Sequence, residues 1–322
     1  MSPPHGHPVS RVVLAILALA LVVLPWLLPA QGYVLRVACL VLLFAAMSQA
    51  WNIAAGLSGQ ISLGHAGFFG AGAYTSTLLL IHFNLSPWLG LVFAGFVGAA
   101  LAALISLPTM KLKGHYFALA TLAFGEAMRV IANSWGSLTG GPVGISVPFA
   151  EPGFALMQFQ SLRPYYYIML VALAVTCITF HRIRTSALGL RLRALKNHAD
   201  AAASLGVDTA VAKLLASTAS GALIAMLGVL YAQFQFFFDP DTAFSLAGVS
   251  IRVALIAIIG GVGTVAGPLV GALLILPIEE ATNAYLSSHA AGLSQMVFGA
   301  ILIAVVVLQP RGLLHLWKTV RR

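Results

Sequence analysis

Charged side chains are scarce in this sequence. They make up 8% of its 322 residues, whereas hydrophobic residues make up 60%. A soluble domain carries about 25% charged residues, because its surface must face water. A chain this poor in charge cannot cover itself for water, so lipid must be part of its solvent. The scarcity therefore excludes an ordinary soluble enzyme or binding domain.

Residues that build catalytic or metal sites are also few. Cys39 and Cys177 are the two cysteines, each inside an apolar stretch, and we interpret both as small buried hydrophobes. His5 and His7 form only a weak metal motif. The sequence has no Gly-x-Ser-x-Gly elbow and no Gly-Lys pair, so it lacks a Walker A loop to cradle phosphates. We expect no catalytic residue, no metal and no cofactor, and hence no enzyme.

Long apolar runs fill most of the chain. A membrane-spanning helix needs roughly 20 apolar residues, and lipid satisfies no backbone hydrogen bonds, so only helices and closed barrels span it. The runs do not alternate with period two, which excludes a barrel. We predict one all-α transmembrane domain over residues 1–322, a polytopic helix bundle of about ten spans. These spans are predicted at 11–30, 33–55, 60–82, 88–108, 115–134, 165–181, 211–237, 247–262, 264–283 and 292–310.

The net charge of +9 comes from Lys and Arg in short segments between the apolar runs. This is the positive-inside pattern. It predicts that both termini lie in the cytoplasm, with a leader at 1–10, a basic loop at 182–210 and a tail at 311–322. We expect residues 11–30 to be an uncleaved first span and not a secretory signal. The predicted outer segments contain Glu151, Arg163, Asp239 and Asp241, of which one is basic.

Glycine is concentrated in two stretches, 56–72 and 260–271, at similar places in the two halves of the chain. Gly263, Gly267 and Gly271 lie four residues apart, so one face of a helix there would carry no side chains and allow close packing. The pairing of the two stretches hints at an internal repeat of the kind that transporters use.

The basic loop contains the most specific local pattern. Its alanine-rich run from Asp200 to Leu205 predicts a short helix, because alanine loses no side-chain entropy. The Asp200 carboxylate suits the start of this helix. Gly206 can take the left-handed position that ends it, and Asp208 can cap the next helix. The pattern predicts a helix–Gly–helix elbow in the cytoplasm; an ordinary basic loop with one helical turn is the alternative.

Several stretches resemble known permeases. The spacing Asp200-Ala201-Ala202-x-x-x-Gly206 resembles the EAA loop of ABC importer permeases, with Asp in place of the usual Glu. The chain also resembles the LivM-type permease family of branched-chain amino acid transporters. This resemblance runs in order from about residue 35 to 314, with the motifs at 57–70, 114–126, 138–145 and 309–313.

The resemblance implies a permease subunit of an ATP-driven importer in the bacterial inner membrane. It would translocate branched-chain or related amino acids by alternating access, and a urea or short-amide permease is the alternative within the same class. The implied partners are a second permease, two cytoplasmic ATPase subunits that hydrolyse the ATP, and a periplasmic binding protein. The residues implied to couple to the ATPase are Asp200, Ala201, Ala202, Leu205 and Gly206.

Polar residues inside the predicted spans are candidates for the translocation path. Glu126 and Arg129 each cost about 2.5–3.5 kcal/mol at a helix centre, and three residues apart they can pair on one helix face. A polar pathway wall and a structural ion pair both fit this pattern. His65 fits a hydrogen-bonded core histidine or a translocation residue. The path candidates are Gln60, Ser62, His65, Tyr116, Thr121 and Glu126.

Two other classes of function remain open at this stage. A proton-coupled secondary transporter or channel could use Glu126 as its coupling carboxylate, but it would leave the elbow at Gly206 without a role. A membrane-embedded enzyme is disfavoured, because the sequence offers no paired catalytic groups.

Overall fold

The computed structural model describes residues 20–110, 112, 114–149 and 151–286, together with 292, 296, 297, 299 and 300. After a helix at 20–27, the long helices are α2 (Tyr33–Ser58), α3 (His65–Phe83), α4 (Pro87–Thr109), α5 (His115–Ser134), α7 (Leu162–Thr185), α10 (Thr209–Gln235) and α13 (Gly267–Leu286). Shorter elements connect them: α6 (Gly136–Thr139), η1 (Gly141–Val143), β1 (Ile145–Ser146), η2 (Phe154–Leu156), α8 (Ala187–Asn197), α9 (Ala199–Ser204), β2 (Phe237–Phe238), α11 (Pro240–Ala243), the π-helical η3 (Leu246–Ile251) and α12 (Arg252–Gly260).

The helical transmembrane fold is confirmed, but the count of about ten spans is not. Within the described ranges, seven helices are long and apolar enough to cross a membrane, counting Pro240–Gly260 as one. α5 has the predicted bounds, 115–134, yet is not among the seven. The last predicted span, 292–310, falls mostly outside the described residues, and of the first, 11–30, the structure describes residues 20–30.

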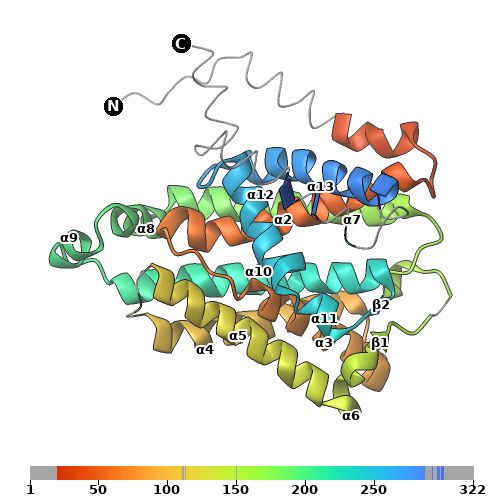
Figure 1. Cartoon of the computed structure of the whole chain (residues 1–322), viewed down its shortest axis with the longest axis horizontal. Coiled ribbons are helices and arrows are strands. Elements are labelled where there is room, and N and C mark those ends of the chain that lie inside the picture. The colour runs from red at the N-terminus through yellow and green to blue at the C-terminus, as the bar shows by residue number, and fades with distance from the viewer. Residues whose placement is uncertain are drawn as a thin grey trace.

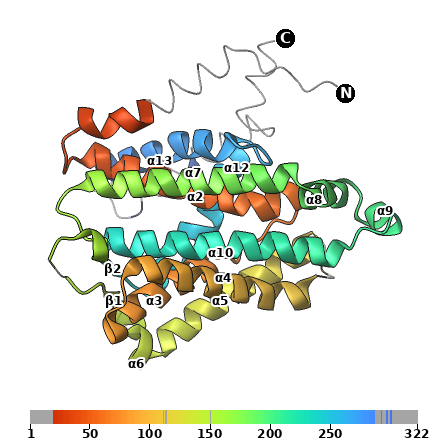
Figure 2. The same cartoon turned by 180° about the vertical axis from the view of Figure 1, so that it is seen from behind.

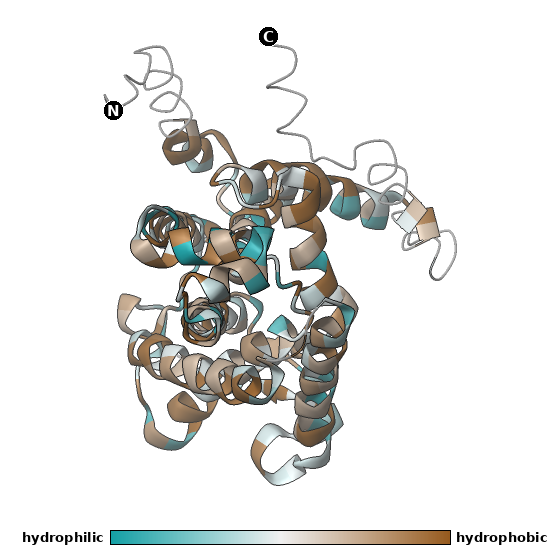
Figure 3. Cartoon of the chain, turned by 90° about the vertical axis from the view of Figure 1, so that its left-hand side faces the viewer, coloured by the Kyte–Doolittle hydropathy of each residue, from teal (hydrophilic) through white to brown (hydrophobic). Residues whose placement is uncertain are grey.

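The helices form two groups that meet where α2 packs on α10. One group contains α2, α7, α12 and α13, and the other contains α3, α4 and α10, with α5 against α3. Figure 1 shows the groups as two layers whose long helices run roughly parallel, and Figure 2 shows the same layers from behind. In an end-on view, hydrophobic residues colour most of the helices (Figure 3). α2 is the buried centre, because almost all its residues from Val41 onward are covered.

Glycines allow the closest helix crossings. A Cβ on Gly72 of α3 would lie 2.0 Å from the Ala225 carbonyl oxygen of α10, and a Cβ on Gly228 of α10 would lie 2.1 Å from the Phe69 carbonyl oxygen. At this crossing the two backbones touch, as small residues permit in membrane bundles. The predicted glycine face is partly wrong. Gly267 and Gly271 lie on α13 against α12, but Gly263 precedes the helix with a φ of +79°.

Two short non-helical links, 59–64 and 261–266, lie against α2. Trp51 donates its indole Nε1–H to the Ser62 carbonyl oxygen at 2.9 Å. The neighbouring Asn52 donates to the Thr264 carbonyl oxygen at 2.9 Å and accepts from the Gly263 N–H at 2.7 Å. These hydrogen bonds satisfy backbone N–H and C=O groups of the two links that have no partner within a helix. They also explain why α3 and α13 begin at 65 and 267, later than the spans predicted from 60 and 264.

The two ends of the bundle differ in charge. α8 and α9 project at one end, while α6 and the antiparallel pair β1–β2, with Ile145 opposite Phe238, lie at the other (Figure 1). The α8–α9 end carries the basic loop, and the opposite end carries the acidic α11 segment. The basic residues of the loop are Arg182, Arg184, Arg191, Arg193 and Lys196. This separation agrees with the predicted grouping of charge.

Candidate functional site

Three of the predicted path residues lie together around a small cavity. The cavity has a volume of about 10 Å³, which is near the minimum for one water molecule. It lies where α3, α4, α5 and α10 approach the link 59–64. Its polar lining is Ser62, His65, Ser106, Thr109, Thr121 and Ser217. The structure therefore gathers hydroxyl groups from elements far apart in sequence around one histidine.

His65 is the first residue of α3 and is buried. Its Nε2 lies 2.9 Å from the Ser220 hydroxyl, which donates its own proton to the Ala50 carbonyl oxygen at 2.8 Å. Because a hydroxyl has one proton to donate, Nε2 carries the hydrogen and donates it to Ser220. Nδ1 is then an acceptor, buried and without a partner in the described part of the chain.

Thr121 of α5 binds the link 59–64 at the cavity through its side-chain hydroxyl. Its hydroxyl accepts the Leu63 N–H at 3.0 Å and donates to the Ala118 carbonyl oxygen at 3.0 Å. At the next residues, the Ala66 N–H donates to the Ser250 hydroxyl of η3 at 2.8 Å. The start of α3 is thus held by side chains of α5 and of the π-helical turn.

Replacing Thr121 by valine is expected to destabilise the protein by about 1–3 kcal/mol, because the Leu63 N–H, which is partly buried, would lose its acceptor. Thr109→Val is the matched control. Its hydroxyl also lines the cavity but bonds only to carbonyls of its own helix, Ile105 and Ser106. Unfolding of the purified variants measures both effects, and an equal loss in the two would contradict the role given to Thr121.

The other path candidates do not line this cavity. Gln60 is half-buried on the link, and Tyr116 is 73% exposed on α5. Glu126 lies on the same exposed face of α5 as Tyr116 and Leu119, farther along the helix toward α6. This face is mostly apolar and carries one carboxylate.

The predicted pairing of Glu126 with Arg129 is present and extends to a third charge. Arg129 Nε donates to Glu126 Oε1 at 3.0 Å, while Nη1 donates to the Asp241 carboxylate of α11. Asn133 Nδ2 also donates to Asp241, at 3.0 Å. The side chains of Arg129, Glu126 and Asp241 are 33%, 46% and 62% exposed. Arg129 therefore ties α5 to α11 at the surface, and the cluster carries one net negative charge.

The predicted elbow is present at the basic end. α9 covers 199–204, Gly206 has a φ of +81°, and the Asp208 side chain accepts the Val211 N–H at 3.0 Å to cap α10. The Val207 N–H closes α9 onto the Ala202 carbonyl oxygen at 3.1 Å, as in a helix ending on a left-handed glycine. At the tip, Leu205 is 85% exposed.

Sequence reasoning missed Asn52 and Ser220, which hold the link 261–266 and His65. The sequence did indicate that both residues are structurally important, because each is a polar residue inside a long apolar run, and a buried polar group needs a hydrogen-bond partner. The partner could not be read from the sequence. Asn52 bonds residues more than 200 positions away, and Ser220 bonds Ala50, 170 positions away.

Residues 33–306 match the family described as "Branched-chain amino acid transport system / permease component". The chain is 28% identical to the high-affinity branched-chain amino acid transport system permease protein LivM of Escherichia coli (strain K12), over 95% of this chain and 75% of the relative. It is 26% identical to the corresponding LivH of Salmonella typhimurium, over 84% and 91%. No solved structure matches the chain. Since the family match spans most of its length, the protein belongs to the family of permease components of branched-chain amino acid transport systems.

Proposed function

We propose that this chain is the membrane-spanning subunit of an ATP-driven importer for branched-chain or related amino acids. The observation that carries the proposal is the family match over residues 33–306. The names of the relatives supply the substrate class. A helix bundle with an exposed elbow at its basic end supports the same function, because a chain without a Walker A loop must receive the work of ATP hydrolysis through a contact surface.

The proposed assembly contains a second permease subunit, two cytoplasmic ATPase subunits and a periplasmic binding protein. Matches to both LivM and LivH support a pair of related permeases. In this arrangement the chain is one transmembrane domain in the bacterial inner membrane, with both termini and the coupling loop 182–210 in the cytoplasm. The charge difference between the bundle ends supports this orientation.

Within the assembly, the elbow formed by Asp200, Ala201, Ala202, Leu205 and Gly206 docks on an ATPase subunit. Its movement is passed to the helices, which switch as rigid bodies between outward-open and inward-open states. α10 begins directly after the elbow and crosses α3 and α4, so a displacement of the elbow reaches the helix that begins at His65.

The cavity around Ser62, His65 and Thr121 is the closed inner section of the translocation path in this proposal. Its hydroxyls suit the polar backbone group of an amino acid, and its volume of about 10 Å³ admits no substrate in this state. Gln60 lies at the link beside it. Tyr116 and Glu126 lie on the exposed face of α5, which would form the wall shared with the second permease.

Glu126→Gln is expected to reduce uptake several-fold without lowering the amount of folded protein. Exposed ion pairs contribute about 0–1 kcal/mol to stability, so a structural role alone predicts little change in either quantity. Asp241→Asn is the matched control, because it breaks the bridge from Arg129 to α11 and leaves Glu126 in place. Equal uptake by the two variants would remove Glu126 from the path.

The proposed function is tested by uptake of labelled leucine into cells that express this chain with its neighbouring permease, ATPase and binding-protein genes. Uptake that requires both ATP and this chain is the expected result. Uptake that persists after ATP depletion would instead indicate a secondary transporter. Transport of urea or short amides with no leucine uptake would keep the ATP-driven mechanism and overturn the substrate class.

A further inference from the structure

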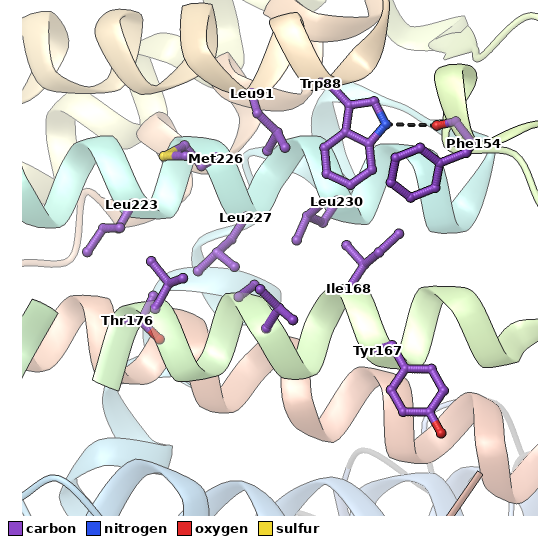
Figure 4. Close-up of a pocket in the computed structure, with 13 residues that line it drawn as sticks. Trp88, Leu91, Phe154, Tyr167, Ile168, Thr176, Leu223, Met226, Leu227 and Leu230 are labelled. Atoms are coloured by element: carbon purple, nitrogen blue, oxygen red, sulfur yellow. Dashed lines mark hydrogen bonds between the residues drawn. The ribbon is translucent and has the colours of Figure 1, made fainter. Parts of the chain in front are cut away.

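An apolar groove lies between α7 and α10, at the seam between the two helix groups. Its volume is about 370 Å³, and its walls come from α4, η2, α7 and α10. Figure 4 shows side chains of α7 and α10 directed toward each other across the groove, with Trp88 and Phe154 at one end and Thr176 near the other. The groove is separate from the cavity at His65 and shares no lining residue with it.

The polar groups of the groove lining are all bonded within the chain. The Thr176 hydroxyl donates to the Leu173 carbonyl oxygen at 2.9 Å, and Trp88 Nε1–H donates to the Phe154 carbonyl oxygen at 2.8 Å. The Tyr167 hydroxyl donates to the Val22 carbonyl oxygen at 2.9 Å. The groove therefore presents hydrocarbon to its occupant. A polar solute would lose its hydration there without replacement, which excludes an amino acid backbone.

The groove opens onto the apolar outside of the bundle. Val171 and Val175 on its α7 wall are 61% and 47% exposed. The neighbouring outer surfaces are apolar as well, with Phe93 and Phe96 of α4 exposed by 48% and 71%. In a chain that spans the membrane these surfaces meet acyl chains, and the groove is a hollow in that surface.

One end of the groove has the features of a membrane–water interface. Trp88 stacks on Phe154 with ring centroids 4.9 Å apart, and Tyr167 lies at the same end (Figure 4). Trp and Tyr favour the headgroup level of a bilayer. Arg163 lies one helical turn before Tyr167, with its guanidinium 4.8 Å from the Trp26 ring. Its Nε also donates to the Pro25 carbonyl oxygen at 3.1 Å, so Arg163 does not line the groove but places a positive charge at the same end of α7 as Tyr167. It is the one Lys or Arg in the predicted outer segments.

We propose that this groove is a binding site for one acyl chain of a membrane phospholipid, with the lipid phosphate beside Arg163. The hydrocarbon lining, the opening onto the lipid-facing surface and the interfacial aromatics with a cation at one end each fit this ligand. The acyl chain fills the seam between α7 and α10 along the direction of the helices. The site is independent of the transported substrate.

Native mass spectrometry of the assembled transporter in mild detergent tests the site. Ala172 lines the groove, whereas Ala174 on the same helix is exposed outside it, so Ala172→Phe fills the groove and Ala174→Phe is its matched control. We expect one retained phospholipid per copy of this chain in the wild type and in Ala174→Phe, and none in Ala172→Phe. Equal retention in all three forms, or no retained lipid in the wild type, overturns the proposal. Dissociation of the permease pair in Ala172→Phe alone, with no lipid in the wild type, would also overturn it, in favour of a protein occupant.

The contact with the phosphate is tested in bilayer nanodiscs that contain phosphatidylglycerol and phosphatidylcholine in equal amounts. The wild type is expected to retain the anionic lipid preferentially, and Arg163→Gln is expected to lose that preference while still retaining one lipid. A preference that survives in Arg163→Gln would overturn the position given to the headgroup.

Discussion

Replacing Gly72 by alanine is expected to leave little folded protein in the membrane. The new Cβ would lie 2.0 Å from the Ala225 carbonyl oxygen and 2.6 Å from the Ala225 Cα. Both atoms are backbone, so no side chain can rotate away, and α3 and α10 would have to separate. Overpacking in a core typically costs about 1–3 kcal/mol, and we expect the upper end of this range or more, because the crossing is equally tight at Gly228.

The yield of monodisperse protein after detergent extraction, together with its melting temperature, measures this effect. Gly125→Ala on α5 is the matched control, since its Cβ would lie 3.6 Å from the Gly64 Cα, an ordinary contact, in a helix where alanine is favoured over glycine. Gly125→Ala should match the wild type in both measurements. A Gly72→Ala variant that extracts and melts like the wild type would show that the two helices are not packed backbone to backbone.

The existence and type of the elements could be predicted because they follow from local chemistry. Continuous apolar runs predicted α2, α4 and α5 to within a few residues. The elbow was predicted in detail, since an alanine run, a glycine able to take φ > 0 and a capping aspartate act over fewer than ten residues. The ion pair of Glu126 with Arg129 is likewise local to one helix. In each case the deciding interaction lies within one or two helical turns.

The remaining features depend on partners distant in the sequence. The links at 59–64 and 261–266 stay non-helical because Trp51, Asn52 and Thr121 bind their backbone. Hydropathy cannot register this, since neither link contains a charged residue that would interrupt the apolar run. Gly263 was assigned to a helix face for the same reason. The cavity at His65 could not be predicted either, because its hydroxyls come from separate helices and its polar character appears only once they pack.

The second large effect is expected at the tip of the elbow. Leu205→Glu should reduce ATP-dependent leucine uptake at least tenfold without impairing membrane insertion. Leu205 is 85% exposed and has a negative φ, with φ −86° and ψ 10°, so glutamate removes little packing within the described chain and adds no strain. In the proposed assembly this leucine would make an apolar contact with an ATPase subunit, and a buried charge there would cost far more than the lost leucine contact.

Two substitutions at Gly206 separate the effect of backbone strain from the effect of side-chain bulk. Apart from its two chain neighbours, no atom of the described residues lies within 4 Å of the position of a Cβ on Gly206, but its φ of +81° favours glycine. Gly206→Ala should therefore cost about 1 kcal/mol and keep most uptake. Gly206→Trp adds bulk at the docking surface and should abolish uptake. Leu190→Glu on α8, where the leucine is 61% exposed, is the control for an added charge on the same projection formed by α8 and α9.

Co-purification of the ATPase subunits with each variant shows whether the variant has lost ATPase binding or only the transmission of movement to the helices. Loss of uptake together with loss of the ATPases would mean that the elbow is the docking element. Loss of uptake with the ATPases still bound would mean that the elbow transmits their movement to α10. Full uptake in both Leu205→Glu and Gly206→Trp would exclude the elbow from the mechanism. Transport would then have to be driven from within the membrane, where Glu126 is the remaining candidate for coupling.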